Sequence, residues 1–195
     1  MIPKLATLLI IAAVVATSAS CGDLVRQGRA PVTLVVKSLL DGEDQSTLRS
    51  DVVTLGSIND DMAKVVMALV LKDPGSLGVT SEPSLMNQVT IDRYHVDYKR
   101  TDGRNTQGVD VPFAFDSAMT FTVPPDGDSD EFVFEIVRHT AKAEAPLFAL
   151  RQSGGILNTI ATITFYGHDQ VGNKVSATAM MGINFADFAD PEGDN

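Results

Sequence analysis

The chain of 195 residues has no tryptophan, a single cysteine and three histidines. One cysteine cannot form an internal disulfide, so a disulfide framework is excluded. The histidines, His95, His139 and His168, include no close-spaced pair of the kind that holds a metal on a helix. We therefore interpret them as structural or exposed residues, and the alternative is that they meet as ligands only in the folded chain.

Positive charge is also scarce, since 15 Lys and Arg stand against 25 Asp and Glu, for a net charge of -10. Nucleic acids and anionic lipid surfaces repel a protein this acidic, which disfavours its binding to them. We therefore expect no nucleic-acid partner. The charges are spread along the chain rather than gathered in long blocks of one sign. Global disorder is therefore not indicated.

Motifs for catalysis are absent as well. There is no phosphate-binding loop, and no strand-helix alternation indicates a parallel α/β sheet. Residues 151–155, Arg-Gln-Ser-Gly-Gly, lack the G-x-S-x-G pattern of a nucleophile elbow, and we interpret Ser153 with the two glycines after it as a flexible loop. No spacing identifies an acid-base pair of carboxylates. We predict no catalytic residue and no enzyme; a hydrolase built from dispersed residues is the least favoured alternative.

The N-terminus carries the clearest signal in the chain. Lys4 precedes an apolar run over residues 5–16, and small residues follow at 17–20 before Cys21. This order is typical of a signal peptide, here residues 1–20. A helix of about twelve apolar residues spans roughly 18 Å, well short of a bilayer core of about 30 Å. A permanent transmembrane anchor is therefore not expected.

The motif Ser18-Ala19-Ser20-Cys21 resembles the lipobox of bacterial lipoproteins, although that family prefers an aliphatic residue where Ser18 stands. The resemblance implies that the Cys21 thiol carries a lipid such as palmitate and becomes the new N-terminus, anchoring the protein to a membrane of the cell envelope. Gly22 is not the aspartate that promotes inner-membrane retention in some bacteria, so we expect the outer membrane, facing the periplasm or the exterior. The alternative is an ordinary small-x-small cleavage site and a soluble secreted or periplasmic protein.

Beyond the signal peptide we expect a tether over residues 21–30, a β domain over 31–186 and an acidic flexible tail over 187–195. Apolar residues recur mostly with a period of two, which indicates strands with one buried face. The expected strands cover residues 32–39, 52–55, 62–72, 89–99, 119–123, 132–138, 158–168 and 175–183. Residues 62–72 also contain good helix formers, so a helix is the alternative there.

Two local features refine this strand pattern. In residues 89–99 the alternation changes phase, which predicts a β-bulge near Asp92 and Arg93. The last two strands flank the turn at 169–174 and should form a terminal hairpin. In the C-terminal region, we expect Phe185 and Phe188 to pack against the domain rather than bind a partner.

The hairpin sequence at residues 166–174, Tyr-Gly-His-Asp-Gln-Val-Gly-Asn-Lys, and the strands before it resemble small immunoglobulin-like domains of exported bacterial proteins. This resemblance implies an all-β fold, a single antiparallel β-sandwich of about seven or eight strands after the N-terminal signal helix. The chain lacks the tryptophan and paired cysteines of antibody-type domains, so only the broad sandwich class carries over. Fold alone does not supply a function.

The densest acidic cluster contains Asp126, Asp128 and Asp130, and alternating carboxylates are what calcium requires. An EF-hand loop fails here, because its sixth position is Glu131 rather than glycine and its twelfth is Val137 rather than glutamate. We interpret the cluster as a solvated turn, and calcium, the only cofactor that the sequence suggests, is the alternative.

The function expected from these observations is that of a membrane-anchored, noncatalytic binding or structural lipoprotein. Its sandwich would present loops or an edge strand to another envelope protein. The alternative is an exported β-sandwich that binds calcium or a small ligand.

Overall fold

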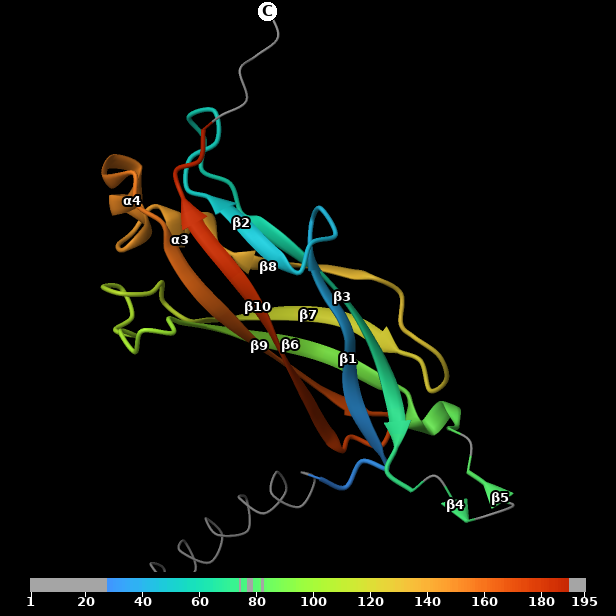
Figure 1. Cartoon of the computed structure of the whole chain (residues 1–195). Helices are drawn as coiled ribbons and strands as arrows, with labels where there is room; N and C mark the ends of the chain where they lie inside the picture. Colours follow the sequence, from blue (N-terminus) through green and yellow to red (C-terminus); the bar gives the residue numbers. More distant parts are fainter. Residues whose placement is uncertain (1–27, 74, 77–78, 82, 190–195) are drawn as a thin grey trace, which may run out of the picture.

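The computed structural model describes residues 28–73, 75–76, 79–81 and 83–189. They form two packed β-sheets with two short helices at one end, which confirms the predicted all-β sandwich (Figure 1). The strands are β1 (Val32–Asp41), β2 (Thr47–Asp51), β3 (Asp61–Leu71), β4 (Gly75–Ser76), β5 (Val79–Thr80), β6 (Val89–Lys99), β7 (Phe115–Val123), β8 (Phe132–Val137), β9 (Leu157–Asp169) and β10 (Lys174–Ala186). The helices are η1 (Leu85–Asn87), α3 (His139–Lys142) and α4 (Leu147–Ser153).

One sheet has the order β1-β3-β8 and the other the order β2-β10-β9-β6-β7. All pairings within these two sheets are antiparallel except that of β2, which runs parallel to β10. β1 and β2 follow each other in the chain but join different sheets. The N-terminal strands thus connect the two layers of the β-sandwich.

Alternating burial along the long strands builds the core between the sheets. In β9, every second residue from Leu157 to Phe165 is buried, Thr159 included, while the residues that alternate with them are more exposed. Residues 62–72 are a strand rather than a helix, and β3 takes the centre of its sheet, where its β-branched residues pack on both neighbours.

The bulge predicted near Asp92 is confirmed. The register of β6 shifts between Ile91 and Arg93 against both β7 and β9. Opposite this bulge lies Gly167 of β9, and a Cβ placed there would come within 2.3 Å of the Thr90 carbonyl oxygen. A glycine is required at this position because the backbones approach too closely for any side chain.

Two expectations on local structure were wrong. The strand expected at residues 52–55 lies earlier, as β2, and the chain leaves it through a turn with positive φ at Leu55 and Gly56. Ser153 is the last residue of α4 rather than part of a flexible loop, and Gly154 ends this helix with a φ of 62°. Neither α3 nor α4 was expected, because both are too short to show a helical period.

The predicted packing of Phe185 and Phe188 is confirmed. Phe185 is fully buried, and the Phe188 ring lies under the Arg49 guanidinium at 4.4 Å. The backbone N–H of Phe188 donates to Asp51 at 3.0 Å, so the chain is held against the sandwich as it leaves β10.

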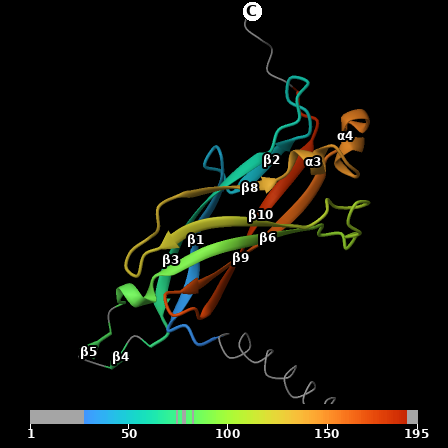
Figure 2. The same cartoon turned by 180° about the vertical axis from the view of Figure 1, so that it is seen from behind.

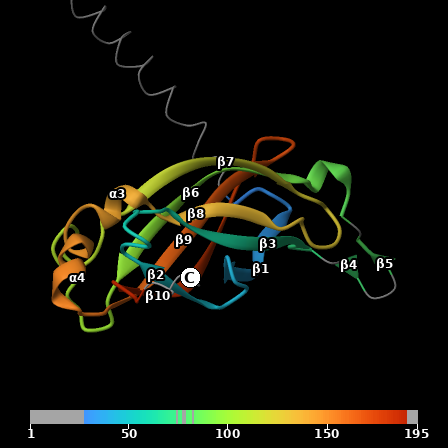
Figure 3. The same ribbon diagram turned by 90° about the horizontal axis from the view of Figure 1, so that it is seen from above.

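The two ends of the sandwich differ. β1 begins at the end that also carries the β9–β10 hairpin, whereas α3, α4 and the loop after β2 lie at the opposite end (Figures 1 and 2). Seen from above, α3 and α4 are far from β4 and β5 (Figure 3). The signal peptide, Cys21 and most of the tether lie outside the described residues. Within the described part of the chain no helix is long and apolar enough to cross a membrane.

Candidate functional site

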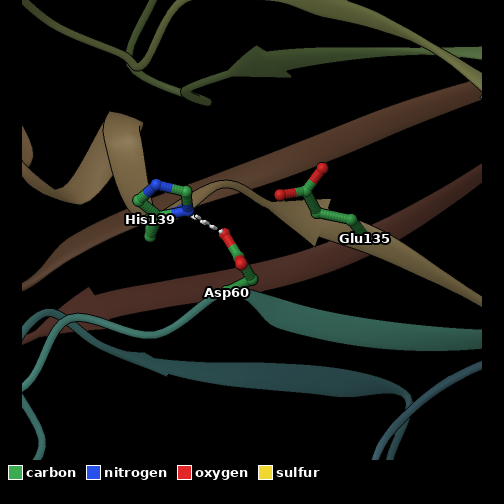
Figure 4. Close-up of side chains that lie close together, drawn as sticks. All are labelled: Asp60, Glu135 and His139. Atoms are coloured by element: carbon green, nitrogen blue, oxygen red, sulfur yellow. Dashed lines mark hydrogen bonds and ion pairs between the residues drawn. The ribbon is translucent and has the colours of Figure 1, made fainter.

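Asp60, Glu135 and His139 meet at the end of the sandwich that carries α3 (Figure 4). Asp60 directly precedes β3, Glu135 belongs to β8 and His139 is the first residue of α3. Their potential ligand atoms all lie within 4.8 Å of one another. Among the described residues this is the one group of three or more carboxylate and imidazole side chains that converges so closely.

The contacts within this group are asymmetric. His139 approaches one oxygen of Asp60 twice, through Nδ1 at 2.7 Å and through its donating backbone N–H at 2.5 Å. Glu135 instead pairs with the Arg138 guanidinium, whose Nε is 3.4 Å away. Asp60 is therefore fixed by the start of α3, whereas Glu135 is held more loosely.

The two carboxylates titrate in opposite directions. Partial burial raises the pKa of Glu135, the neighbouring Asp60 raises it further, and Arg138 offsets only part of this rise. Burial also raises the pKa of Asp60, but the hydrogen bonds from the backbone and side chain of His139 outweigh it, so the pKa lies below its ordinary value. Asp60 thus stays ionised while Glu135 accepts a proton more readily.

A buried ion pair supports the group from beneath. The Lys142 amine lies 2.8 Å from Asp61, and its side chain is only 2% exposed. The Ser50 hydroxyl donates to the other oxygen of Asp61 at 2.5 Å. Burial raises the pKa of Asp61 and outweighs the effects of Lys142 and Ser50. Because Lys142 is sealed from solvent and paired, we assign it a structural rather than a chemical role.

An open acidic cleft of about 400 Å³ adjoins the group. Asp60 and Asp61 line it, and Arg49 is the only basic residue in its lining. The remaining acids of the cleft are Asp41, Glu43 and Asp51. This arrangement concentrates negative potential at one end of the sandwich and favours cations there.

The residues predicted for calcium lie elsewhere, on the loop between β7 and β8. Asp126, Asp128 and Asp130 are exposed, and they are not among the converging ligand groups of the described residues. Asp128 lies 3.9 Å from the Lys37 amine. Between the acids, Ser129 is buried and exchanges hydrogen bonds with the backbone of Met67. These contacts hold the middle of the loop against β3 and β1.

Each histidine pairs with an aspartate, but only His139 meets a second carboxylate in the group described above. His95 lies 3.2 Å from Asp116, and His168 lies 3.3 Å from Asp92. Sequence reasoning missed the convergence at His139 because Asp60 is 79 residues away in the chain. The only local signal was the spacing of Glu135 and His139 by four residues, which cross from a strand into a helix.

A second feature is the seam of the sandwich between β1 and β10. Residues 182–186 of β10 pair with β2, but residues 175–181 pair only with β9, and β1 pairs only with β3. Between these two edges runs a groove of about 490 Å³, lined by residues 34–39 and 177–180. The opposite seam, between β7 and β8, is closed by Phe121 and Phe132, which stack at 4.7 Å.

Comparison with known proteins does not assign this chain to a family. No family model matches the chain, and no curated protein matches it. A solved structure titled "X-ray structure of Northeast Structural Genomics Consortium target SoR45" is 12% identical, with a TM-score of 0.35 over 83% of this chain and 88% of that one. A likeness this low carries no argument about function. The fold defines the class of protein as an all-β sandwich, with one unpaired seam between β1 and β10 and one acidic end.

Proposed function

We propose that this protein is a noncatalytic binding module of the bacterial cell envelope, anchored by a lipid on Cys21. The lipobox-like sequence before Cys21 supports the anchor, and Gly22 supports the outer membrane. The observation that carries the binding role is the open seam between β1 and β10.

Unpaired strand edges expose a row of backbone donors and acceptors, and soluble proteins usually cover or blunt them. At this seam the edges of β1 and β10 lie close together along one surface groove but do not pair with each other. Val36, Leu39 and Ala177 are only partly buried against the core there, and Met180 of β10 is 69% exposed. An extended segment of a partner protein would cover both the unpaired backbone groups and the exposed apolar side chains. Its backbone pairs with a strand edge, and its apolar side chains cover the groove.

The length of the free edge limits the partner segment. Residues 175–181 of β10 span about 23 Å at roughly 3.3 Å per residue. β2 continues along the same edge from Gly182 onward and closes one end of it. We therefore expect a strand of about six or seven residues with alternating apolar side chains.

To test the anchor, the wild type and a Cys21→Ala variant are produced in the native host. The intact mass of each protein is measured after extraction from the membranes. We expect a lipid mass on residue 21 of the wild type and a soluble, unmodified variant. A wild-type protein that is unmodified and soluble would instead support the secreted or periplasmic alternative.

The seam is tested in the same host with a photoreactive residue at position 180. The matched control places this residue at Thr120, which is exposed on β7 of the same sheet. We expect a defined crosslinked partner peptide, mapped by mass spectrometry, from position 180 only. Equal crosslinking from both positions, or none from position 180, would contradict a seam-binding role.

A further inference from the structure

We infer that Asp60, Glu135 and His139 form a binding site for a divalent transition-metal ion of the zinc class. The group combines one imidazole with two carboxylates, and these come from three separate segments of the fold. The site lies away from the seam, so this inference does not depend on the proposed partner binding.

The donor set selects the class of metal. Calcium and magnesium take oxygen ligands almost exclusively, whereas imidazole together with carboxylate suits zinc and its first-row neighbours. Three protein ligands around zinc leave a position open for water or for a group of another molecule. We therefore expect an accessible site rather than a closed structural one.

The distances require only a small adjustment. Two ligand atoms that share a zinc ion at about 2.0–2.2 Å lie at most about 4.4 Å apart. The present separations reach no more than 4.8 Å, and Asp60 is already fixed by the backbone N–H of His139. Two changes complete the set: Glu135 rotates toward the other two residues, and the 2.7 Å hydrogen bond between His139 Nδ1 and Asp60 opens to about 3.3 Å as the metal replaces the proton between them.

The surroundings allow this rotation. Arg138, the present partner of Glu135, also donates to the Asp116 carbonyl at 2.9 Å and lies 3.9 Å over the Phe115 ring. It keeps these two contacts when Glu135 turns to the metal. The neighbouring Lys142 is neutralised by Asp61, so it offers little repulsion to an incoming cation.

The acidic residues of the adjoining cleft attract cations to the site. Asp41, Glu43 and Asp51 line it together with Asp60 and Asp61. Acids grouped in one cleft raise the local concentration of cations and speed their association. The geometry and the charge of this end of the molecule therefore favour the same class of ligand.

The other two histidines provide matched controls. His95 with Asp116 and His168 with Asp92 have the same imidazole-carboxylate pairing at 3.2 and 3.3 Å. The described residues bring no third ligand to either pair. Substitution of His95 or His168 thus removes an equivalent histidine without touching the inferred site.

The experiment titrates Zn²⁺ alone into the untagged mature chain by calorimetry. The chain carries Cys21→Ala, because a free thiol binds zinc itself. We expect one equivalent of Zn²⁺ to bind, with an affinity at least tenfold lower in His139→Ala and in Glu135→Gln. His95→Ala and His168→Ala should bind as the parent does, and Ca²⁺ should not compete.

Circular dichroism of each variant checks that it is folded, and Glu135→Gln keeps the side-chain size if His139→Ala fails this check. In addition, Co²⁺ should give a visible absorption band that Glu135→Gln weakens and His168→Ala leaves intact. The absence of saturable Zn²⁺ binding, or an equal loss in the His95 and His168 variants, would overturn the inference.

Discussion

Lys142 of α3 and Asp61 of β3 form an ion pair that is almost completely removed from solvent, with 2.8 Å between Nζ and Oδ1. The pair joins the helical end of the chain to the central strand of the three-stranded sheet. The Ser50 hydroxyl occupies the second oxygen of Asp61, so the buried charges are paired and hydrogen-bonded together. A buried pair of this kind stabilises little on balance, but each partner depends on the other.

We therefore expect Lys142→Met to lower the free energy of unfolding by about 3–5 kcal/mol, because it leaves the Asp61 carboxylate buried and unpaired. The double variant Lys142→Met/Asp61→Leu should recover most of this loss. Urea unfolding of the two variants measures both effects. Arg104→Ala, which breaks an exposed pair with Asp102, should change stability little. A double variant no more stable than Lys142→Met would contradict this view of the pair.

Gly167 offers a test of the β-bulge in β6. An alanine there brings its Cβ within 2.3 Å of the Thr90 carbonyl oxygen and 3.0 Å of Ile91 Cα, both of them backbone atoms. We expect Gly167→Ala to cost about 1–3 kcal/mol of unfolding free energy by overpacking. The control is Gly182→Ala in the neighbouring strand, whose Cβ meets only Thr47 side-chain atoms, at 3.4 Å or more. Equal stability of the two variants would show that the bulge relaxes without cost.

The sequence predicted those strands in which apolar and polar residues alternate over a long stretch. β3, the bulged β6 and the β9–β10 hairpin were each visible because long strands with one buried face repeat every second residue. β2 was misplaced because this strand of five residues has only two buried positions, Leu48 and Ser50, and one of them is polar. α3 and α4 were not predicted, because helices of four and seven residues are too short to show a hydrophobic stripe.

The acidic end was not predictable for a different reason. Asp60, Glu135 and His139 meet only because β3 pairs with β8 and the chain then turns into α3. Their proximity is a property of sheet pairing between distant segments, and one sequence does not reveal that pairing. The sequence did show the cluster at 126–130, since those acids are neighbours in the chain.

Asp169 should govern part of the acid stability. It is 1% exposed at the end of β9 and accepts bonds from the backbone N–H groups of Val171 and Asn173 and from the Asn173 amide, at 2.7–3.0 Å. Burial raises the pKa of Asp169, but these hydrogen bonds outweigh it, so the pKa lies below its ordinary value of 3.8. The ionised group therefore stabilises the fold fully above that value, and the stabilisation is lost as the pH falls through the lowered pKa.

We expect Asp169→Asn to cost about 1.5–3 kcal/mol at pH 7, the usual contribution of charged hydrogen bonds. The difference between wild type and variant should shrink as the pH falls below about 4. Denaturant unfolding of both proteins from pH 7 to pH 3 measures it, and the subtraction removes the titration of other acids. A difference that stays constant over this range would show that the native pKa of Asp169 is not lowered.

Ser129 holds the loop at residues 126–131 against Met67 of β3, so two results are expected if the loop is a solvated turn. Ser129→Ala removes the hydroxyl that accepts the buried Met67 N–H at 3.0 Å, so we expect a loss of about 1–3 kcal/mol of unfolding free energy. Calcium at millimolar concentration should leave the Tm of wild type and of Asp128→Asn unchanged, because a solvated turn binds no calcium that could stabilise the folded state. Thermal unfolding with and without calcium decides between the solvated turn and the calcium site. A saturable rise in Tm that Asp128→Asn abolishes would establish calcium binding at Asp126, Asp128 and Asp130, since Asp128 would then be needed for more than its contact with Lys37.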